Sequence, residues 1–172
     1  VTAIAGLFGL TIGSFLNVCT LRWPQDESVV FPGSHCPKCG ADIRWYDNVP
    51  VLGFIMLRGR CRACRGQISV QYPLVELATG LVWAGMFSYA GLSWEALRGG
   101  VFLTILFGIA LTDARFYIIP DQFSLGGLLI GVAMAFFPGG LAPLEALLGA
   151  ALGFGLLQAI AVGGKWMFKK DA

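Results

Sequence analysis

Four of the five cysteines stand in two closely spaced pairs. Cys36 and Cys39 belong to Cys-Pro-Lys-Cys, and after a spacer of 21 residues Cys61 and Cys64 belong to Cys-Arg-Ala-Cys. Two thiolates three positions apart on a tight turn can face one ion, and two such turns complete a tetrahedral set of sulfur ligands. We therefore predict a zinc site at these four cysteines. Because the set is closed, the metal would be structural, with no open position for a substrate.

Two alternatives to the metal site stay open, namely two disulfides and a metal-free cysteine cluster. Disulfides conflict with a reducing cytoplasm, in which the charge pattern described below puts this segment. Gly40 and Gly66 follow the pairs closely, and we expect positive φ angles there. Cys19 lies in an apolar stretch and is expected to pack as a small apolar side chain. His35 is expected to be a surface or capping residue rather than a ligand.

Three carboxylates, Glu76, Asp113 and Asp121, lie in or beside apolar stretches. Charges in such places are costly, so each is a functional candidate. Asp121 follows Pro120 and is expected to be the N-cap of the next helix. Glu76 comes one turn after Pro73, where the helix dipole favours a carboxylate. Asp113 has no comparable structural explanation and is either a solvated helix-end residue or a catalytic group.

The elements that must position these residues are apolar. Hydrophobic residues make up 56% of the 172-residue chain, charged residues 13%, and the mean hydropathy is +0.73. A soluble domain of this size could not bury so much apolar surface. We predict an all-α polytopic membrane protein with about five transmembrane helices and a small zinc-ribbon-like insert. The apolar stretches are residues 1–21, 72–94, 99–112, 123–137 and 144–164.

Three details qualify these stretches. No basic segment precedes residues 1–21, so we interpret that stretch as a span rather than a signal peptide. The short stretch 99–112 could borrow a turn from residues 93–98, and it and residues 123–137 could instead be re-entrant. Small and polar residues in the first stretch, Gly13, Ser14 and Asn17, are expected to make close helix–helix contacts.

The 12 lysines and arginines are distributed very unevenly over the loops. Seven of these basic residues lie in residues 22–71, one is Arg115, and three lie in residues 165–172. If five spans alternate, these eleven fall on one side of the membrane, and Arg98 alone falls on the other side. The positive-inside rule then assigns the eleven, and with them the cysteine insert, to the cytoplasm. The net charge of +2 is too small to indicate nucleic-acid binding.

These features together resemble the bacterial type IV prepilin peptidases. The N-terminal segment of these peptidases is similar to Ile12-Gly13-Ser14-Phe15-Leu16-Asn17-Val18, followed by Arg22. Their cytoplasmic domain is similar to the cysteine pairs together with Asp47-Asn48-Val49-Pro50 and Tyr72-Pro73-Leu74-Val75-Glu76. The first half of their aspartyl catalytic site resembles Thr112-Asp113 followed by Ile119-Pro120-Asp121.

The resemblance implies a membrane aspartyl endopeptidase. Such enzymes cleave the leader peptide of type IV prepilins and of the related pseudopilins of type II secretion, at the cytoplasmic face of the bacterial inner membrane. Many also methylate the new N-terminus with S-adenosylmethionine. Prepilin and membrane lipid are thus the expected partners. The chain would divide into a first transmembrane helix (1–21), a cytoplasmic four-cysteine domain (22–72) and a transmembrane peptidase domain (73–172).

Asp113 would be the first of the family's two catalytic aspartates. The second belongs to a Gly-x-Gly-Asp motif expected after the fifth stretch, where this sequence reads Lys169-Lys170-Asp171-Ala172. Asp171 lacks the glycines, so the role is not transferred to it. We interpret the chain as truncated at its C-terminus and expect it to be inactive as written. Two other functions are considered: a membrane-anchored zinc-binding module without catalysis, and a transporter, for which carboxylates at mid-membrane would be expected.

Overall fold

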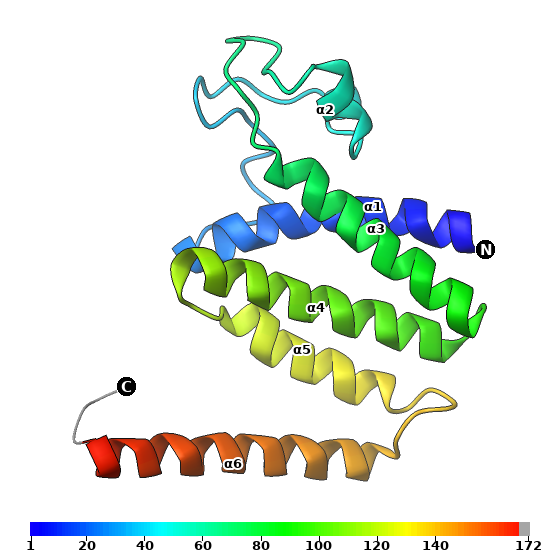
Figure 1. Cartoon of the computed structure of the whole chain (residues 1–172), viewed down its shortest axis with the longest axis vertical. Helices are drawn as coiled ribbons and strands as arrows, with labels where there is room; N and C mark the ends of the chain where they lie inside the picture. The colour runs from blue at the N-terminus through cyan, green and yellow to red at the C-terminus, as the bar shows by residue number, and fades with distance from the viewer. Residues whose placement is uncertain (169–172) are drawn as a thin grey trace.

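The computed structural model describes residues 1–168, and within them the chain is helical with no β-strand (Figure 1). The α-helices are α1 (Thr2–Arg22), α2 (Leu52–Met56), α3 (Gln71–Ala90), α4 (Trp94–Phe116), α5 (Asp121–Met134) and α6 (Pro143–Phe168). Two 3-10 turns, η1 (Trp23–Gln25) and η2 (Trp45–Asp47), complete the elements. The predicted all-α fold is therefore confirmed. Helix α2, inside the insert, was not predicted from the sequence.

A helix forms over each of the five apolar stretches. Among residues 1–168, three segments are long and apolar enough to cross a membrane: Thr2–Gln25, Trp94–Phe116 and Pro143–Ile160. Helix α5 is apolar but shorter, and α3 is not among the three. The chain is thus a membrane protein, while the number of five crossings stays a prediction. Helix α4 does gain its extra turn, because Ser93 caps it by accepting a hydrogen bond from the Ala96 N–H.

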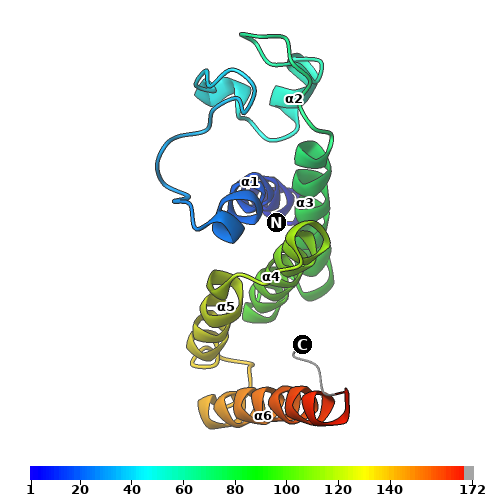
Figure 2. The same ribbon diagram turned by 90° about the vertical axis from the view of Figure 1, so that its left-hand side faces the viewer.

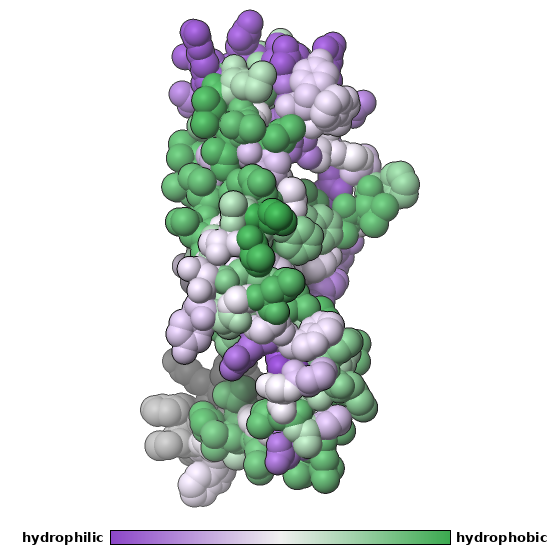
Figure 3. Space-filling view, turned by 90° about the vertical axis from the view of Figure 1, so that its right-hand side faces the viewer, coloured by the Kyte–Doolittle hydropathy of each residue, from purple (hydrophilic) through white to green (hydrophobic). Residues whose placement is uncertain are grey.

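Successive long helices run in opposite directions. In Figure 1, α1, α4 and α6 run toward the left of the view, whereas α3 and α5 start there. The basic residues Arg22 and Arg115 therefore lie at the same end of the bundle, as the alternation of loops requires. Helix α6 stands apart at the base of the stack (Figure 2). Hydrophilic side chains gather most densely over the insert, at the top of Figure 3.

The closest helix pair is α1 with α3, whose backbones nearly touch. A Cβ added to Gly13 would lie 2.7 Å from the Glu76 Cα, and one added to Gly9 would lie 2.9 Å from the Gly80 Cα. Such contacts require residues without a side chain, as in other membrane helix pairs. Cys19, 2% exposed, belongs to the adjoining apolar core, which confirms its expected packing role.

The N-cap expected at Asp121 is wrong by one residue. Helix α5 begins at Asp121, and Pro120 is the N-cap without a side-chain hydrogen bond. The ring of Pro120 fixes its φ angle, so Pro120 itself occupies the N-cap position at the end of the preceding loop. Asp121 is therefore the first residue of the helix. A carboxylate there is still favoured by the helix dipole.

Candidate functional site

Both cysteine pairs lie on turns with the same backbone hydrogen bonds. The Cys36 N–H donates to the Ala41 carbonyl at 2.9 Å, and the Gly40 N–H donates to the Cys36 carbonyl at 2.8 Å. In the second turn, Cys61 donates to Gly66 at 2.8 Å and Arg65 donates to Cys61 at 3.0 Å. The two turns are therefore equivalent, and each presents two thiols toward the other.

The two cysteine turns also place a positive φ angle at the same position. This position is the fourth residue after the first cysteine of each pair: Gly40 has φ +70° and Arg65 has φ +59°. The expectation was right for Gly40 but wrong for Gly66, which follows that position by one residue. Gly66 instead leaves room beside a thiol of the cluster, because a Cβ there would lie 3.2 Å from the Cys64 Sγ atom.

The four thiol sulfur atoms converge on one point. All lie within 4.8 Å of one another, and the Sγ atoms of Cys36 and Cys64 are 3.9 Å apart. A tetrahedral ion with metal–sulfur bonds of about 2.3 Å needs sulfur atoms about 3.8 Å apart. The cysteines are free thiols rather than the disulfides of the alternative. The cluster can therefore hold a metal ion.

The pKa values of two thiols in this cluster are shifted by the surrounding backbone and by the other thiols. Hydrogen bonds from the Lys38 and Cys39 backbone N–H groups lower the pKa of Cys36 to about 6. For Cys39 the Ala41 backbone N–H acts in the same direction, but the neighbouring Cys64 thiol, burial and the other thiols outweigh it and raise its pKa to about 11. Four close thiols cannot all ionise without a cation to offset their charge, which a metal ion supplies.

An ion pair joins the Asp-Asn-Val-Pro segment to the second cysteine turn. Arg62 donates from Nε to Asp47 Oδ2 at 2.7 Å and from Nη2 to Asp47 Oδ1 at 2.6 Å. The Asp47 side chain is only 6% exposed, whereas that of Arg62 is half exposed. The Arg62 guanidinium lowers the pKa of Asp47 below its usual value. This bidentate pair fixes η2 against the second cysteine turn.

Glu76 joins the insert to the membrane helices. Its Oε2 accepts a hydrogen bond from the Val51 N–H at 2.7 Å, and Ser14 of α1 lines the same cavity as Glu76. Nearby, Asn17 Nδ2 donates to the Tyr72 carbonyl at 3.1 Å, which confirms the expected helix–helix contact. The sequence explained Glu76 by the helix dipole alone and gave no signal for the Val51 contact.

Asp113 lies in the last turn of α4 and is exposed. Its backbone carbonyl accepts the C-capping hydrogen bond from the Tyr117 N–H at 2.9 Å. Arg115 does not pair with either aspartate: it donates to Gln71 Oε1 at 2.8 Å, and the one ion pair within residues 1–168 is Arg62–Asp47. Asp113 is thus at the helix end where α3 begins.

A cavity of about 1240 Å³ separates the insert from the membrane helices. Its wall includes Ser14 of α1, Cys36 and Asp47 of the insert, Glu76 of α3, and Arg115 near the end of α4. Polar groups from both parts of the protein therefore meet across one space. The sequence could not reveal this cavity, because its walls come from segments far apart in the chain.

The fold and the site define a helical membrane protein with a four-cysteine insert, able to hold a metal ion, between its first two long helices. Comparison with known families is specific: residues 7–90 match the bacterial peptidase A24 N-terminal domain, and residues 100–171 match the type IV leader peptidase family. The chain belongs to this family, as the sequence motifs predicted. No solved structure is significantly similar.

Curated relatives cover nearly all of the chain. A prepilin leader peptidase/N-methyltransferase of Myxococcus xanthus is 41% identical over 166 residues, which are 96% of this chain and 50% of the relative. One from Klebsiella pneumoniae is 39% identical over 95% of the chain and 72% of the relative. One from Neisseria gonorrhoeae is 34% identical over 90% of the chain and 62% of the relative. The chain thus spans about half the length of the first relative.

Proposed function

We propose that this chain belongs to a membrane aspartyl endopeptidase that cleaves the leader peptide of type IV prepilins or pseudopilins, and that also methylates the new N-terminus. The single observation that carries the proposal is the position of Asp113. Its exposed carboxylate lies at the end of α4, on the same side of the bundle as the attachment of the insert. The names of the relatives support both activities.

In this mechanism Asp113 is one of two carboxyl groups. Peptide hydrolysis needs one carboxylate to take a proton from water and one acid to protonate the scissile carbonyl. Two close carboxyls share a proton because both cannot ionise cheaply, and this sharing supplies both roles. Asp121 is not proposed as the partner. Asp171 lies outside the described residues, and its role is not inferred.

The proposed metal is zinc, bound by Cys36, Cys39, Cys61 and Cys64. A set of four thiolates with tetrahedral spacing favours zinc. Because the four cysteines would fill every coordination position, the role of the metal would be structural. The ion would hold the two cysteine turns together. The chain's own residues, Asp47 with Arg62 and Glu76 with Val51, then fix this unit above the helices.

The proposed methyl donor is S-adenosylmethionine, which supplies a methyl group to the amine of the cleaved pilin. The cavity between the insert and the helices, about 1240 Å³, has room for such a ligand beside a peptide end. We also propose that the membrane is the bacterial inner membrane and that the insert is cytoplasmic. The uneven distribution of basic residues supports this orientation.

The test is cleavage of a type IV prepilin in liposomes by a chain that includes the family's Gly-x-Gly-Asp segment. Asp113→Asn should lower cleavage by about 10³-fold, since asparagine can neither accept a proton from water nor share one. Asp121→Asn is the matched control and should retain most activity, because only a helix-dipole interaction is lost. Full cleavage by the Asp113→Asn protein would contradict the aspartyl mechanism. A zinc-binding module without catalysis, the alternative, would cleave nothing in any form.

A further inference from the structure

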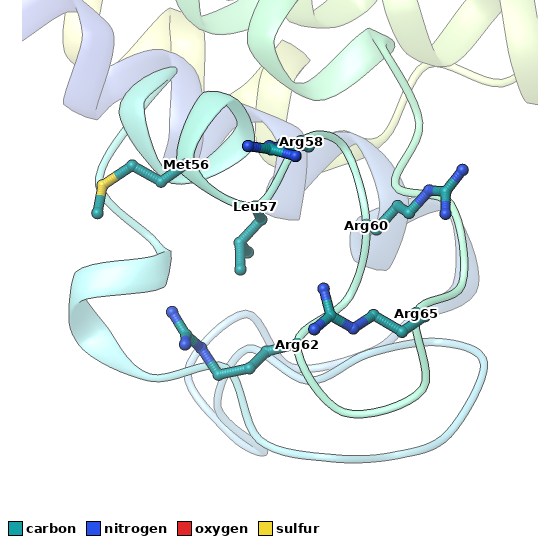
Figure 4. Close-up of a pocket in the computed structure, with 6 residues that line it drawn as sticks. All are labelled: Met56, Leu57, Arg58, Arg60, Arg62 and Arg65. Carbon is teal, nitrogen blue, oxygen red and sulfur yellow. The ribbon is translucent and has the colours of Figure 1, made fainter.

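Four arginines surround a hollow in the surface of the insert. Arg58, Arg60, Arg62 and Arg65, together with Met56 and Leu57, line a space of about 560 Å³ (Figure 4). Arg62 and Arg65 extend toward the space below Leu57, and Arg60 points away from it. Only Arg62 has a carboxylate partner in residues 1–168, so the hollow carries an excess of positive charge. Such a concentration of guanidinium groups favours an anion.

Two of these arginines stand at backbone positions that suit glycine better. Arg58 has φ +52° and Arg65 has φ +59°, both in the left-handed region. The neighbouring turn positions Gly40 and Gly59 have similar angles. A side chain there strains the backbone, so the turns alone would be better served by glycine. The use of arginine at both positions points to a role for the charged side chains.

The basic hollow continues into an exposed apolar face. Helix α2 presents Leu52, Ile55 and Met56, which are 57%, 62% and 72% exposed, and Met56 also lines the hollow. Three large apolar side chains on a helix of only five residues form an unpartnered surface. Apolar side chains next to arginines are the pattern by which a helix inserts into the interface of an anionic membrane.

Helix α2 is attached on the insert side of the bundle. Its N-cap, Val51, is held by Glu76, the sixth residue of α3, and Ser14, which lies eight residues before the end of α1, is in the wall of the same cavity. At 1.5 Å per residue, Glu76 is about 8 Å from the start of α3 and Ser14 is about 12 Å from the end of α1. Both residues lie nearer to the insert-side ends of these helices than to their far ends, which is the side on which an interfacial helix would meet the membrane surface.

We propose that α2 and the arginine hollow form an interfacial membrane contact, in which Leu52, Ile55 and Met56 lie among acyl chains and the arginines bind the phosphates of anionic phospholipids. Lipid is favoured over a protein partner because the apolar and basic parts are contiguous, since Met56 belongs to both, and because the excess positive charge complements anionic headgroups. The contact would fix the metal-binding insert against the membrane beside the end of α4. The proposal does not depend on the peptidase activity.

The first test measures lipid selectivity of the whole chain in nanodiscs of phosphatidylcholine with about 30% phosphatidylglycerol. Native mass spectrometry of the released protein gives the ratio of the two lipids retained. Arg58→Gly and Arg65→Gly suit the positive φ angles and should each lower the retained phosphatidylglycerol ratio about fivefold. The double variant Arg58→Lys/Arg65→Lys keeps the charge and should keep the preference. Arg44→Gln, an exposed insert arginine outside the hollow, should change the ratio less than twofold.

The second test places a photoreactive phenylalanine analogue at position 55, where it should crosslink to acyl chains, and at exposed Asp42 as the aqueous control. Unchanged phosphatidylglycerol retention in the double Arg58→Gly/Arg65→Gly variant would overturn the proposal. So would an equal loss in Arg44→Gln, or displacement of phosphatidylglycerol by millimolar inorganic phosphate, which would indicate a site for a free anion. Crosslinking of position 55 to an added prepilin rather than to lipid would assign the surface to a protein partner.

Discussion

The Glu76 carboxylate accepts a hydrogen bond from the backbone N–H of Val51, 25 residues earlier in the chain, at 2.7 Å. Glu76 belongs to α3 and is 7% exposed, whereas Val51 is the N-cap of α2, the short helix of the insert. One hydrogen bond therefore connects the four-cysteine insert to the α1–α3 pair, close to where Gly13 lets the two backbones approach.

Replacing Glu76 should loosen the insert without unfolding the helices. Glu76→Ala leaves the Val51 N–H without its acceptor, at a cost of about 1–3 kcal/mol, whereas Glu76→Gln keeps an acceptor oxygen and should be milder. Limited proteolysis in detergent would show faster cleavage within residues 26–70 for the alanine variant. Equal protection of the insert in the Glu76→Ala and unmodified proteins would disprove the connecting role.

Removal of one ligand should release the metal. Cys61→Ser leaves three thiolates, so the bound zinc, expected at one per chain, should fall well below that value. Cys19→Ser provides the matched control, because Cys19 is buried in the helix core and outside the cluster. Elemental analysis of the purified proteins gives the zinc content. Zinc retained in full by Cys61→Ser would remove these cysteines from the site.

The Asp47–Arg62 pair should make the insert sensitive to acid. Arg62 lowers the pKa of Asp47 in the folded protein, so the pair contributes stability above the ordinary aspartate pKa of about 4. That contribution is lost as the pH falls from there through the lowered pKa. Trp45 fluorescence of the metal-loaded protein, followed from pH 7 to pH 2, would report the change. Asp47→Asn should already be destabilised at pH 7, and it should lose less on acidification than the unmodified protein.

Arg98 should stabilise the junction of α4, α5 and α6. Its guanidinium donates to the Phe137 carbonyl at 2.6 Å and the Pro138 carbonyl at 2.9 Å, and it also reaches Met134. These acceptors are carbonyls just past the end of α5, which no helical N–H can satisfy. Arg98→Ala should lower the melting temperature in detergent by several degrees, and Arg98→Lys by less. Unchanged melting of Arg98→Ala would show that these contacts contribute nothing to stability.

The sequence alone was sufficient for the cysteine cluster, the apolar helices and the family. Cys36, Cys39, Cys61 and Cys64 form a recognisable set because ligand spacing on a tight turn is a local property. The helices follow from hydropathy, which is summed over neighbouring residues, and the family follows from short motifs around Asp113 and Glu76. Each of these signals depends on residues close together in the chain.

Only the tertiary structure decided which distant residues meet. Glu76 binds Val51 rather than serving the helix dipole alone, Arg115 of α4 binds Gln71 of α3, and the left-handed residue of the second cysteine turn is Arg65 rather than Gly66. The arginine hollow and the large cavity arise in the same way. The Glu76 contact and the large cavity depend on how α1, α3 and the insert pack together. Close approach at Gly13 and the Asn17–Tyr72 hydrogen bond join α1 to α3, and the Val51–Glu76 bond joins the insert to α3; no local pattern encodes these contacts.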